Sequence, residues 1–155
     1  MEFYAKWFDE LSSSEVYEIL KERQKIFVVE QSIVYVDADD VDYKSLHCFI
    51  MHDGVIEAYL RAFYDEKKSV KTVSIGRVLT RIHGKGWGRQ LMEQSLVVIL
   101  QKLPCSIIRM DAQKYATGFY EKYGFKVVSD EYLEEGIVHV DMEVTADEMI
   151  NRLKR

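Results

Sequence analysis

The sequence predicts a mixed α+β fold in one domain spanning residues 1–155, with a central, mostly antiparallel, twisted sheet flanked by helices. Strand-like runs follow one another as a meander in the first half of the chain, whereas strands alternate with helices only in the second half. The length of 155 residues fits a single core and is too short for two. Hydrophobic residues make up 48% and charged residues 30% of the chain, which excludes a disordered or low-complexity protein.

The N-terminal residues predict a strand followed by an amphipathic helix. Residues 2–8 are rich in aromatic side chains and are expected to form the first strand. Ser12 and Glu15 have the spacing of a capping box, so a helix is expected to begin there. Apolar residues then recur at helical spacing until about Val28, which predicts a helix packed on the surface of the core.

Between residues 30 and 46 the apolar periodicity stops, and we expect a long loop or short helix with a functional role. This stretch contains four aspartates: Asp37, Asp39, Asp40 and Asp42. Beyond it, Asp53-Gly54 separates two β-type runs, residues 46–52 and 55–64, and this dipeptide is the strongest short-range signal of a hairpin. Residues 70–80 predict a further antiparallel strand.

The second half of the chain predicts alternating helices and strands. A helix is expected from Trp87 onward, and Pro104 prevents it from continuing. The remaining elements are expected in this order: a strand at 106–110, a helix at 115–123, strands at 125–129 and 137–144, and a last short helix capped at Thr145.

Charge and cysteine content narrow the possible partners. The chain has 21 basic and 26 acidic residues and a net charge of −5, which argues against nucleic acid held by a broad basic surface. Cys48 and Cys105 are too few for a disulfide framework and lack the spacing of a zinc site, so no metal is expected. No secretion signal and no apolar run of 18 residues is visible, which predicts a cytoplasmic protein without a membrane span.

The segment from His83 to Arg89 carries the sharpest functional signal. Its glycines at 84, 86 and 88 stand between a predicted strand and a predicted helix, where successive amides can turn toward an anion at the helix N-terminus. The spacing differs from the dinucleotide fingerprint, which needs its third glycine where Arg89 stands, and no signature for a nucleoside triphosphate follows. By itself, such a turn serves equally well as a tight entry into a helix.

Two segments, Ile75 to Arg89 and Ala116 to Phe125, resemble motifs of the GNAT superfamily of N-acetyltransferases. Its acyl-coenzyme A (acyl-CoA) motif is similar to Ile75-Gly76-Arg77-Val78 running into Gly84-Lys85-Gly86-Trp87-Gly88-Arg89. Its later helix, commonly A-x-x-F-Y-x-x-x-G-F, resembles Ala116 to Phe125. A narrower resemblance to the ElaA-like branch of the superfamily rests on Phe27 to Gln31, Asp39, Asp42, His47, Gln113 and Gly136 to His139.

The resemblance implies a GNAT-type acyl-CoA N-acyltransferase fold and direct transfer of an acetyl group from acetyl-CoA to a primary amine of a small molecule or peptide. Backbone groups of Val78 and Thr80 would hold the pantetheine arm, and the turn amides would hold the pyrophosphate. The residues that the resemblance assigns to co-substrate binding are Val78, Leu79, Thr80, His83, Gly84, Lys85, Gly86, Trp87, Gly88, Arg89 and Gln113. A monomer or a homodimer is expected.

Such a reaction needs a proton donor and a proton acceptor. The position of Tyr120 in the second motif implies that its hydroxyl protonates the departing thiolate; the alternative is a tyrosine that packs in the core. The acceptor amine must also lose a proton, and the sequence leaves open whether Glu30, His47 or His139 receives it, directly or through water. We expect these three side chains to line one pocket.

Charged residues beside the candidate site have two interpretations each. The aspartates at 37–42 either form an acidic mouth that attracts a cationic amine or are merely solvated. Arg61 and Arg77 either pair with acidic residues in a buried bridge or bind a carboxylate of the acceptor. A different class of function is also compatible with the glycine turn, namely a non-catalytic module that binds or senses acyl-CoA and needs neither Tyr120 nor a base.

Overall fold

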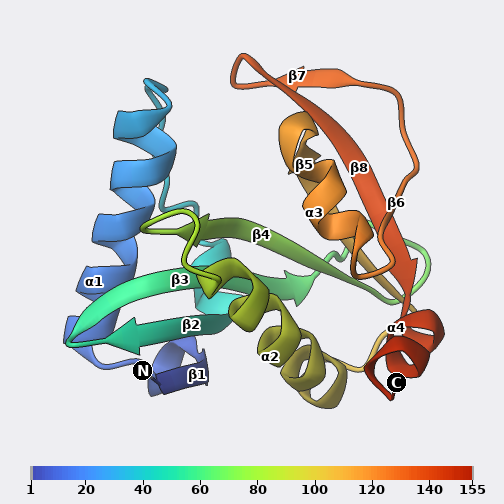
Figure 1. Ribbon diagram of the computed structural model, residues 1–155, viewed down its shortest axis with the longest axis horizontal. Helices are drawn as coiled ribbons and strands as arrows, with labels where there is room; N and C mark the ends of the chain where they lie inside the picture. Colours follow the sequence, from blue (N-terminus) through green and yellow to red (C-terminus); the bar gives the residue numbers. More distant parts are fainter. Residues whose placement is uncertain (1, 155) are drawn as a thin grey trace. The chain divides into compact units, whose positions relative to one another are not determined.

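A computed structural model describes residues 2–154 and divides the chain into two compact units (Figure 1). The first unit comprises Met1–Phe63 and Arg77–Ile99, and the second comprises Tyr64–Gly76 and Leu100–Arg155. Each unit contains its own strands and buried residues, so a single domain over residues 1–155 stays a prediction. Within the described residues, no helix combines the length and the apolar content needed to cross a membrane.

The first unit is built on three antiparallel strands. β1 (Glu2–Trp7) pairs with β2 (Leu46–His52), and β2 pairs with β3 (Val55–Tyr64). The predicted hairpin is confirmed, because Asp53 and Gly54 join β2 to β3 with φ angles of 51° and 74°, the left-handed pair that a tight two-residue turn needs. Most of β2 and β3 is buried, whereas β1 is half-buried.

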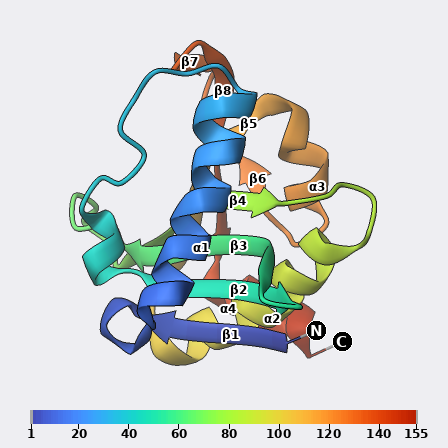
Figure 2. The same ribbon diagram turned by 90° about the vertical axis from the view of Figure 1, so that its left-hand side faces the viewer.

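α1 (Ser13–Arg23) lies across these three strands (Figure 2). The capping box predicted at its start is present, because Glu15 N donates to Ser12 Oγ at 3.1 Å and Ser12 N donates to Glu15 Oε1 at 2.8 Å. The expected helix continues beyond α1, but its last seven residues form a π-helical segment, η2 (Gln24–Glu30). This geometry is rare and changes which face each side chain takes, so apolar periodicity alone does not reveal it.

The core of the first unit lies between α1 and the strands. Its buried members are Ile19, Phe49, Ile56, Tyr59 and Leu79. Two short 3₁₀ segments, η1 (Phe8–Glu10) and η3 (Val41–Lys44), contact each other beside it. Together these elements enclose the side of β2 and β3 on which the polar groups described below are buried.

The second unit contains the parallel pair of strands. Its strands are the N-terminal part of β4 (Thr72–Thr80), β5 (Ile107–Gln113), β6 (Lys126–Val127), β7 (Tyr132–Glu134) and β8 (Ile137–Thr145). β4 runs parallel to β5, whereas β8 is antiparallel to β5, β6 and β7. β6 is shorter than the strand predicted at 125–129, and β7 was not predicted, because both are short and largely exposed.

The helices lie close to their predicted positions. α2 (Trp87–Lys102) ends before Pro104 as expected. η4 (Lys114–Ala116) and α3 (Thr117–Glu121) together occupy the helix predicted at 115–123, and α4 (Ala146–Leu153) follows Thr145, whose Oγ1 accepts a hydrogen bond from Glu148 N at 3.1 Å. The described residues thus form eight strands and four α-helices, which confirms the predicted α+β class.

Candidate active site

The predicted glycine turn lies between β4 and α2 in the first unit. Gly84 and Gly86 have φ angles of 80° and 78°, a conformation that other residues rarely adopt. A Cβ atom at either position would meet no atom within 4 Å, so backbone conformation rather than crowding requires glycine. Gln90 N donates to Gly86 O at 3.2 Å, which is the first hydrogen bond of the helix. The chain therefore enters α2 directly from a left-handed turn.

This turn has the donors of an anion-binding site. The amides of residues 87–89 open α2, where helical amides have no acceptor within the helix and the dipole is positive. Lys85 is exposed in the turn, and Arg89, with a side chain 76% exposed, forms an ion pair with Glu93 at 3.0 Å. Exposed pairs of this kind are weak, so Arg89 can exchange Glu93 for a phosphate group. The donors fit a pyrophosphate.

The other residues assigned to the co-substrate come from both units. Val78 and Thr80 are half-buried in β4, and Thr80 Oγ1 lies 3.4 Å from Nδ1 of His83. Leu79 packs into the core of the first unit and can contribute only its backbone. Gln113 ends β5 in the second unit, where it is half-buried. Their roles stay predictions.

Arg77 interrupts the regular backbone of β4. Its φ angle is 52°, which is uncommon for a residue with a long side chain. Nε donates to Asp37 Oδ1 at 2.8 Å, and Nη2 donates to the backbone oxygen of Asp37 at 3.1 Å and lies 3.4 Å from Asp39 Oδ2. The guanidinium also lies over the ring of Tyr35, 5.8 Å from its centroid. Arg77 therefore forms a bridge to acidic residues, which was one of the two alternatives predicted from the sequence.

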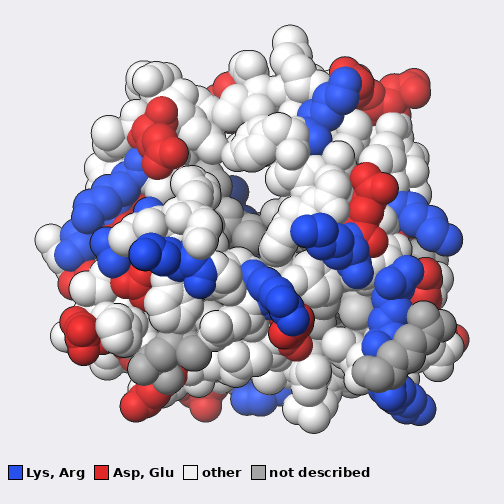
Figure 3. Space-filling model, in the orientation of Figure 1, with Lys and Arg blue, Asp and Glu red and all other residues white. Residues whose placement is uncertain are grey.

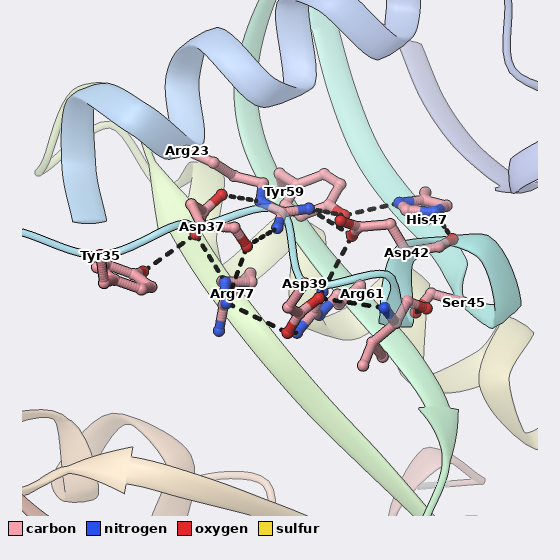
Figure 4. A network of polar contacts seen from close by, with 11 residues as sticks. Arg23, Tyr35, Asp37, Asp39, Asp42, Ser45, His47, Tyr59, Arg61 and Arg77 are labelled. Atoms are coloured by element: carbon pink, nitrogen blue, oxygen red, sulfur yellow. Dashed lines mark hydrogen bonds and ion pairs between the residues drawn. The ribbon is translucent and has the colours of Figure 1, made fainter. Parts of the chain in front are cut away.

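Arg77 belongs to a ring of charged side chains in the first unit (Figure 4). Its members are Arg23, Arg61, Arg77, Asp37, Asp39 and Asp42. The fully buried Arg23, at the end of α1, donates to Asp37 Oδ2 at 2.8 Å and to Asp42 Oδ1 at 2.5 Å. Arg61, on β3, donates to both carboxylate oxygens of Asp39 at 2.7 Å and to Asp42 Oδ1 at 3.0 Å. Each aspartate pairs with two arginines, so positive and negative charges alternate around a closed ring.

The ring lowers the pKa of two of its carboxyl groups, those of Asp39 and Asp42. Burial alone would raise the pKa of Asp39, but the hydrogen bonds and the charge of Arg61 lower that pKa to about 2. Burial opposes the charge of Asp42 as well, yet Arg23 and Arg61 lower its pKa below the ordinary value. Three of the four loop aspartates are thus paired with arginines, and Asp40, outside the ring, is exposed with a φ angle of 67°.

His47, a candidate base, is buried on β2 with partners at both ring nitrogens. Nε2 lies 2.9 Å from the backbone oxygen of Asp42, which can only accept, so Nε2 carries the proton. Nδ1 lies 2.7 Å from Tyr59 Oη and accepts the hydroxyl proton. Burial lowers the pKa of His47, which favours the neutral ring. These contacts favour a structural role, and proton transfer at His47 stays a prediction that they do not support.

Glu30, a second candidate base, ends η2 and is exposed. The first unit has a cavity of about 210 Å³, lined by His47 and Asp42 together with apolar side chains such as Phe8 and Ile19. Glu30 is not among its lining residues, so this cavity does not bring Glu30 and His47 together as expected. Its volume is also below the 300–1,000 Å³ or so that is usual for ligand pockets.

Tyr120, the candidate proton donor, lies on α3 in the second unit with 8% of its surface exposed. Its ring packs edge-on against Phe119 and Phe125, with centroids 5.3 and 6.3 Å away. Burial raises the pKa of Tyr120 above its ordinary value, and the nearby Tyr115 adds to the rise. The hydroxyl is therefore protonated at neutral pH, as a proton donor must be. A packed core tyrosine would show the same geometry, so the role of Tyr120 stays a prediction.

His139, the third candidate base, is buried on β8 of the second unit. Nδ1 lies 2.8 Å from the backbone oxygen of Ile137, so Nδ1 carries the proton of the neutral ring. Nε2 lies 3.5 Å from Oε2 of Glu134, whose side chain is half-exposed. The ring stacks on Tyr132, with 6.0 Å between centroids and 22° between planes. In this arrangement the neutral ring keeps its lone pair on Nε2, the nitrogen that can receive a proton.

Sequence reasoning missed a polar cluster next to His139. Tyr132 Oη donates to Asp141 Oδ1 at 2.6 Å, and Arg109 forms ion pairs with Asp111 and, at 3.3 Å, with Asp141. Burial, followed by the hydrogen bond to Asp141, raises the pKa of Tyr132. The available signal was the alternation of Arg109 and Asp111 along β5, because such charges on a sheet need cross-strand partners, and Asp111 lies opposite Asp141.

The charged side chains on one face and the possible metal ligands can be described directly. Lys and Arg side chains are interspersed with acidic and uncharged ones on the face shown in Figure 3, so this face has no single broad basic surface. Among residues 2–154, no group of three or more His, Cys, Asp or Glu side chains is placed to hold a metal ion. Cys48 and Cys105 are both thiols.

Known proteins are similar to this chain in sequence and in fold. The acetyltransferase (GNAT) domain family matches residues 39–146. A UPF0039 protein of Schizosaccharomyces pombe is 38% identical over 146 residues, which cover 92% of this chain and 95% of the relative. A crystal structure of an acyl-CoA N-acyltransferase from Pseudomonas aeruginosa has a TM-score of 0.84 and 32% identity, covering 92% of this chain and 99% of that chain. The structure of Escherichia coli ElaA has a TM-score of 0.85 and 31% identity, covering 92% and 97%.

These similarities show the class of protein. The fold is that of the acyl-CoA N-acyltransferases, and the protein is an acyltransferase enzyme. The chain belongs to the GNAT acetyltransferase family, in its ElaA-like branch. The family membership and the fold that the motif resemblance implied are both confirmed.

Proposed function

We propose that this protein transfers the acetyl group of acetyl-CoA directly to a primary amine of a small molecule or peptide. The observation that carries the proposal is the left-handed glycine turn at the start of α2, with Lys85 and Arg89 beside it. Family membership supports acyl transfer in general. The turn supports a CoA-type co-substrate in particular, because a pyrophosphate supplies the negative charge that such a turn attracts.

The first unit would bind the co-substrate. The amides of residues 84–89 would hold the pyrophosphate, and Lys85 or Arg89 would reach a phosphate group. Val78 and Thr80 would offer backbone groups to the pantetheine arm. Acetyl-CoA itself supplies the activated thioester. In this assignment the protein contributes fixed donors and a fixed strand edge.

The second unit would carry out the proton transfers. Tyr120 would protonate the departing thiolate, for which a buried and protonated phenol is suited. His139 is the preferred acceptor of the amine proton, because its lone pair is on Nε2 and the carboxylate of Glu134 would stabilise the imidazolium. Glu30 or a water molecule is the alternative acceptor.

A turnover screen with acetyl-CoA over polyamines, amino acids, aminoglycosides and peptides tests the proposal. Release of the CoA thiol should depend on one class of amine. Binding of acetyl-CoA in calorimetry without turnover on any amine would favour the alternative, a binding or sensing module. Absence of both binding and turnover would overturn the proposal.

We also propose a cytoplasmic location and a monomeric or homodimeric state. The thiols Cys48 and Cys105 support a reducing compartment, because small secreted domains are usually disulfide-rich. Light scattering on the purified protein measures the oligomeric state, and cell fractionation measures the location.

A further inference from the structure

Arg77 differs from the other residues that have a left-handed backbone. Among the described residues, four more non-glycine residues have φ angles between 50° and 67°: Ser32, Asp40, Asp53 and Glu135. Each of those four lies in a turn or loop, whereas Arg77 lies inside β4. A left-handed residue breaks the extended backbone of its strand, here called the bend of β4, and this conformation persists only where the surroundings fix it.

The side chain of Arg77 is fixed mainly by Asp37. Its two shortest hydrogen bonds, at 2.8 and 3.1 Å, go to the carboxylate and the backbone oxygen of Asp37. Arg23 holds Asp37 from the other side in the same manner, donating to the second carboxylate oxygen at 2.8 Å and to the same backbone oxygen at 3.1 Å. Tyr35 Oη adds a hydrogen bond to Asp37 at 3.0 Å. Asp37, with a side chain 9% exposed, is therefore an anchor between α1 and β4.

The bend at Arg77 comes directly before the strand segment that the proposed function assigns to the pantetheine arm. Leu79, two residues further along, is locked into the core of the first unit. The backbone groups of Val78 and Thr80 are therefore aimed by two fixed points, the bend at Arg77 before them and the buried Leu79 between them. A change at either point would turn these groups away from their present direction.

We propose that Asp37 is a positioning residue for acyl-CoA: acting through Arg77, it holds the bend of β4 that aims the backbone groups of Val78 and Thr80. The inference rests on the proposed function, in which this strand segment binds the co-substrate. Asp37 itself touches no part of the co-substrate in this account. The loop before β2 thus contributes to the co-substrate site without forming a contact in it.

A competing role for Arg77 is direct binding of an anionic group, which would depend on its charge rather than on its backbone. Two substitutions separate these roles. Arg77→Ala removes the charge and also disfavours the left-handed conformation. Arg77→Gly removes the same charge, but glycine adopts that conformation without help. If positioning is the role, the glycine variant keeps more function than the alanine variant.

Calorimetry with CoA on folded variants is the test. We expect the affinity to fall about tenfold in Arg77→Ala and clearly less in Arg77→Gly. Asp37→Asn should weaken binding in the wild-type background and add nothing in the Arg77→Gly background, because Asp37 acts through Arg77. Asp53→Ala is the matched control: Asp53 has nearly the same φ angle, 51°, but lies in the turn between β2 and β3, so CoA affinity should not change.

The possible outcomes separate this inference from the proposed function. Equal losses in the alanine and glycine variants of Arg77 would overturn positioning in favour of direct charge recognition. Unchanged affinity in every variant, with CoA bound normally by the wild type, would overturn the inference alone. If the wild type binds no CoA, the proposed function fails. Amide hydrogen exchange at residues 78–80 then still tests the anchor, because it should be faster in Arg77→Ala than in Arg77→Gly.

Discussion

Each unit contains a buried histidine packed on a tyrosine, and the two pairs differ in their connections. In the first unit, the ring centroids of His47 and Tyr59 are 5.9 Å apart, and the tyrosine hydroxyl donates to Nδ1 of the histidine. In the second unit, His139 and Tyr132 are 6.0 Å apart, but that hydroxyl donates to Asp141 instead. In the first pair the two side chains are hydrogen-bonded to each other. In the second pair they are not, and Nε2 of His139 faces the half-exposed carboxylate of Glu134.

This difference teaches that the partner of the second ring nitrogen, rather than burial or stacking, decides what a histidine can do. In the first unit both ring nitrogens of His47 have a fixed partner, and each aspartate of the charged ring is likewise held by two arginines. In the second unit Nε2 of His139 faces the carboxylate of Glu134, so the neutral ring and the imidazolium differ only in whether this nitrogen holds a proton. Holding a co-substrate needs fixed groups, whereas accepting a proton needs a group that can change its state.

The largest effect is expected from Tyr120→Phe, which would locate the proton chemistry in the second unit. The substitution keeps the ring and removes the proton, so turnover with acetyl-CoA should fall about 10²–10⁴-fold while CoA affinity stays nearly unchanged. Steady-state kinetics and calorimetry measure the two effects. Tyr123→Phe is the matched control, because its ring packs on the same Phe119 at 5.6 Å. Wild-type turnover in Tyr120→Phe would remove this residue from the mechanism.

Gly86→Val should weaken CoA binding about a hundredfold, which would locate co-substrate binding in the first unit. Valine disfavours the left-handed turn, so at least two charge-assisted bonds to phosphate, each worth about 1.5–3 kcal/mol, would be misaligned. Gly54→Val is the control, because Gly54 has a similar φ angle of 74° and equally open surroundings. Calorimetry on both folded variants should show a loss of CoA affinity only for Gly86→Val. If the two variants bind CoA with equal affinity, the pyrophosphate binds at another place.

Exchanging either histidine for glutamine tests the comparison itself. His139→Gln should lower kcat/KM about 10–100-fold and flatten its rise between about pH 6 and 8. His47→Gln should leave that rise in place but lower the free energy of unfolding by about 1–3 kcal/mol, because buried hydrogen bonds to Tyr59 and Asp42 are disturbed. pH-rate profiles and urea unfolding of both variants are the measurements. If only His47→Gln flattened the pH dependence, His47 would be the proton acceptor and His139 the structural residue.

The smallest effect is expected from the charged ring at low pH. The pKa of Asp39 is about 2 in the folded chain, against an ordinary 3.8. A lowered carboxyl pKa stabilises the fold above about pH 4, and this contribution is lost as the pH falls toward 2. Because the Asp39 side chain is 33% exposed, solvent screening limits the contribution to about 1 kcal/mol. Urea unfolding of Asp39→Asn should show a flatter pH dependence in this window, and an unchanged slope would contradict the assignment.

The elements that could be predicted depend on neighbours in the chain. The capping box at Ser12, the Asp53-Gly54 turn and the end of α2 before Pro104 each follow from a few adjacent residues, and all three are confirmed. The π-helical η2 (Gln24–Glu30) and the bend at Arg77 could not be predicted, because their sequences fit an ordinary helix and strand. At Arg77, hydrogen bonds to Asp37, 40 residues away in the chain, override the local preference.

The candidate site shows the same division. The motifs around the glycine turn and Tyr120 were sufficient to recognise the family, which the comparisons confirm. That Arg61 and Arg77 need partners follows from their apolar surroundings, but their choice among four loop aspartates does not, because 22 and 40 residues separate them from Asp39 and Asp37. The hydrogen-bond partners of the two histidines could not be predicted either. One ring nitrogen of each lies against a backbone oxygen, and every residue has such an oxygen, so the sequence carries no signal for it.

The separation of 40 residues between Asp37 and Arg77 also sets an order of events during synthesis. At about 5–20 residues per second, Arg77 leaves the ribosome roughly 2–8 s after Asp37. Arg23 precedes Asp37 by only 14 residues, so the loop can dock on α1 while β4 is still being made. We therefore expect the nascent chain to form the contact between Arg23 and Asp37 first. The bend in β4 would form last, when Arg77 pairs with the carboxylate of Asp37 that Arg23 already holds.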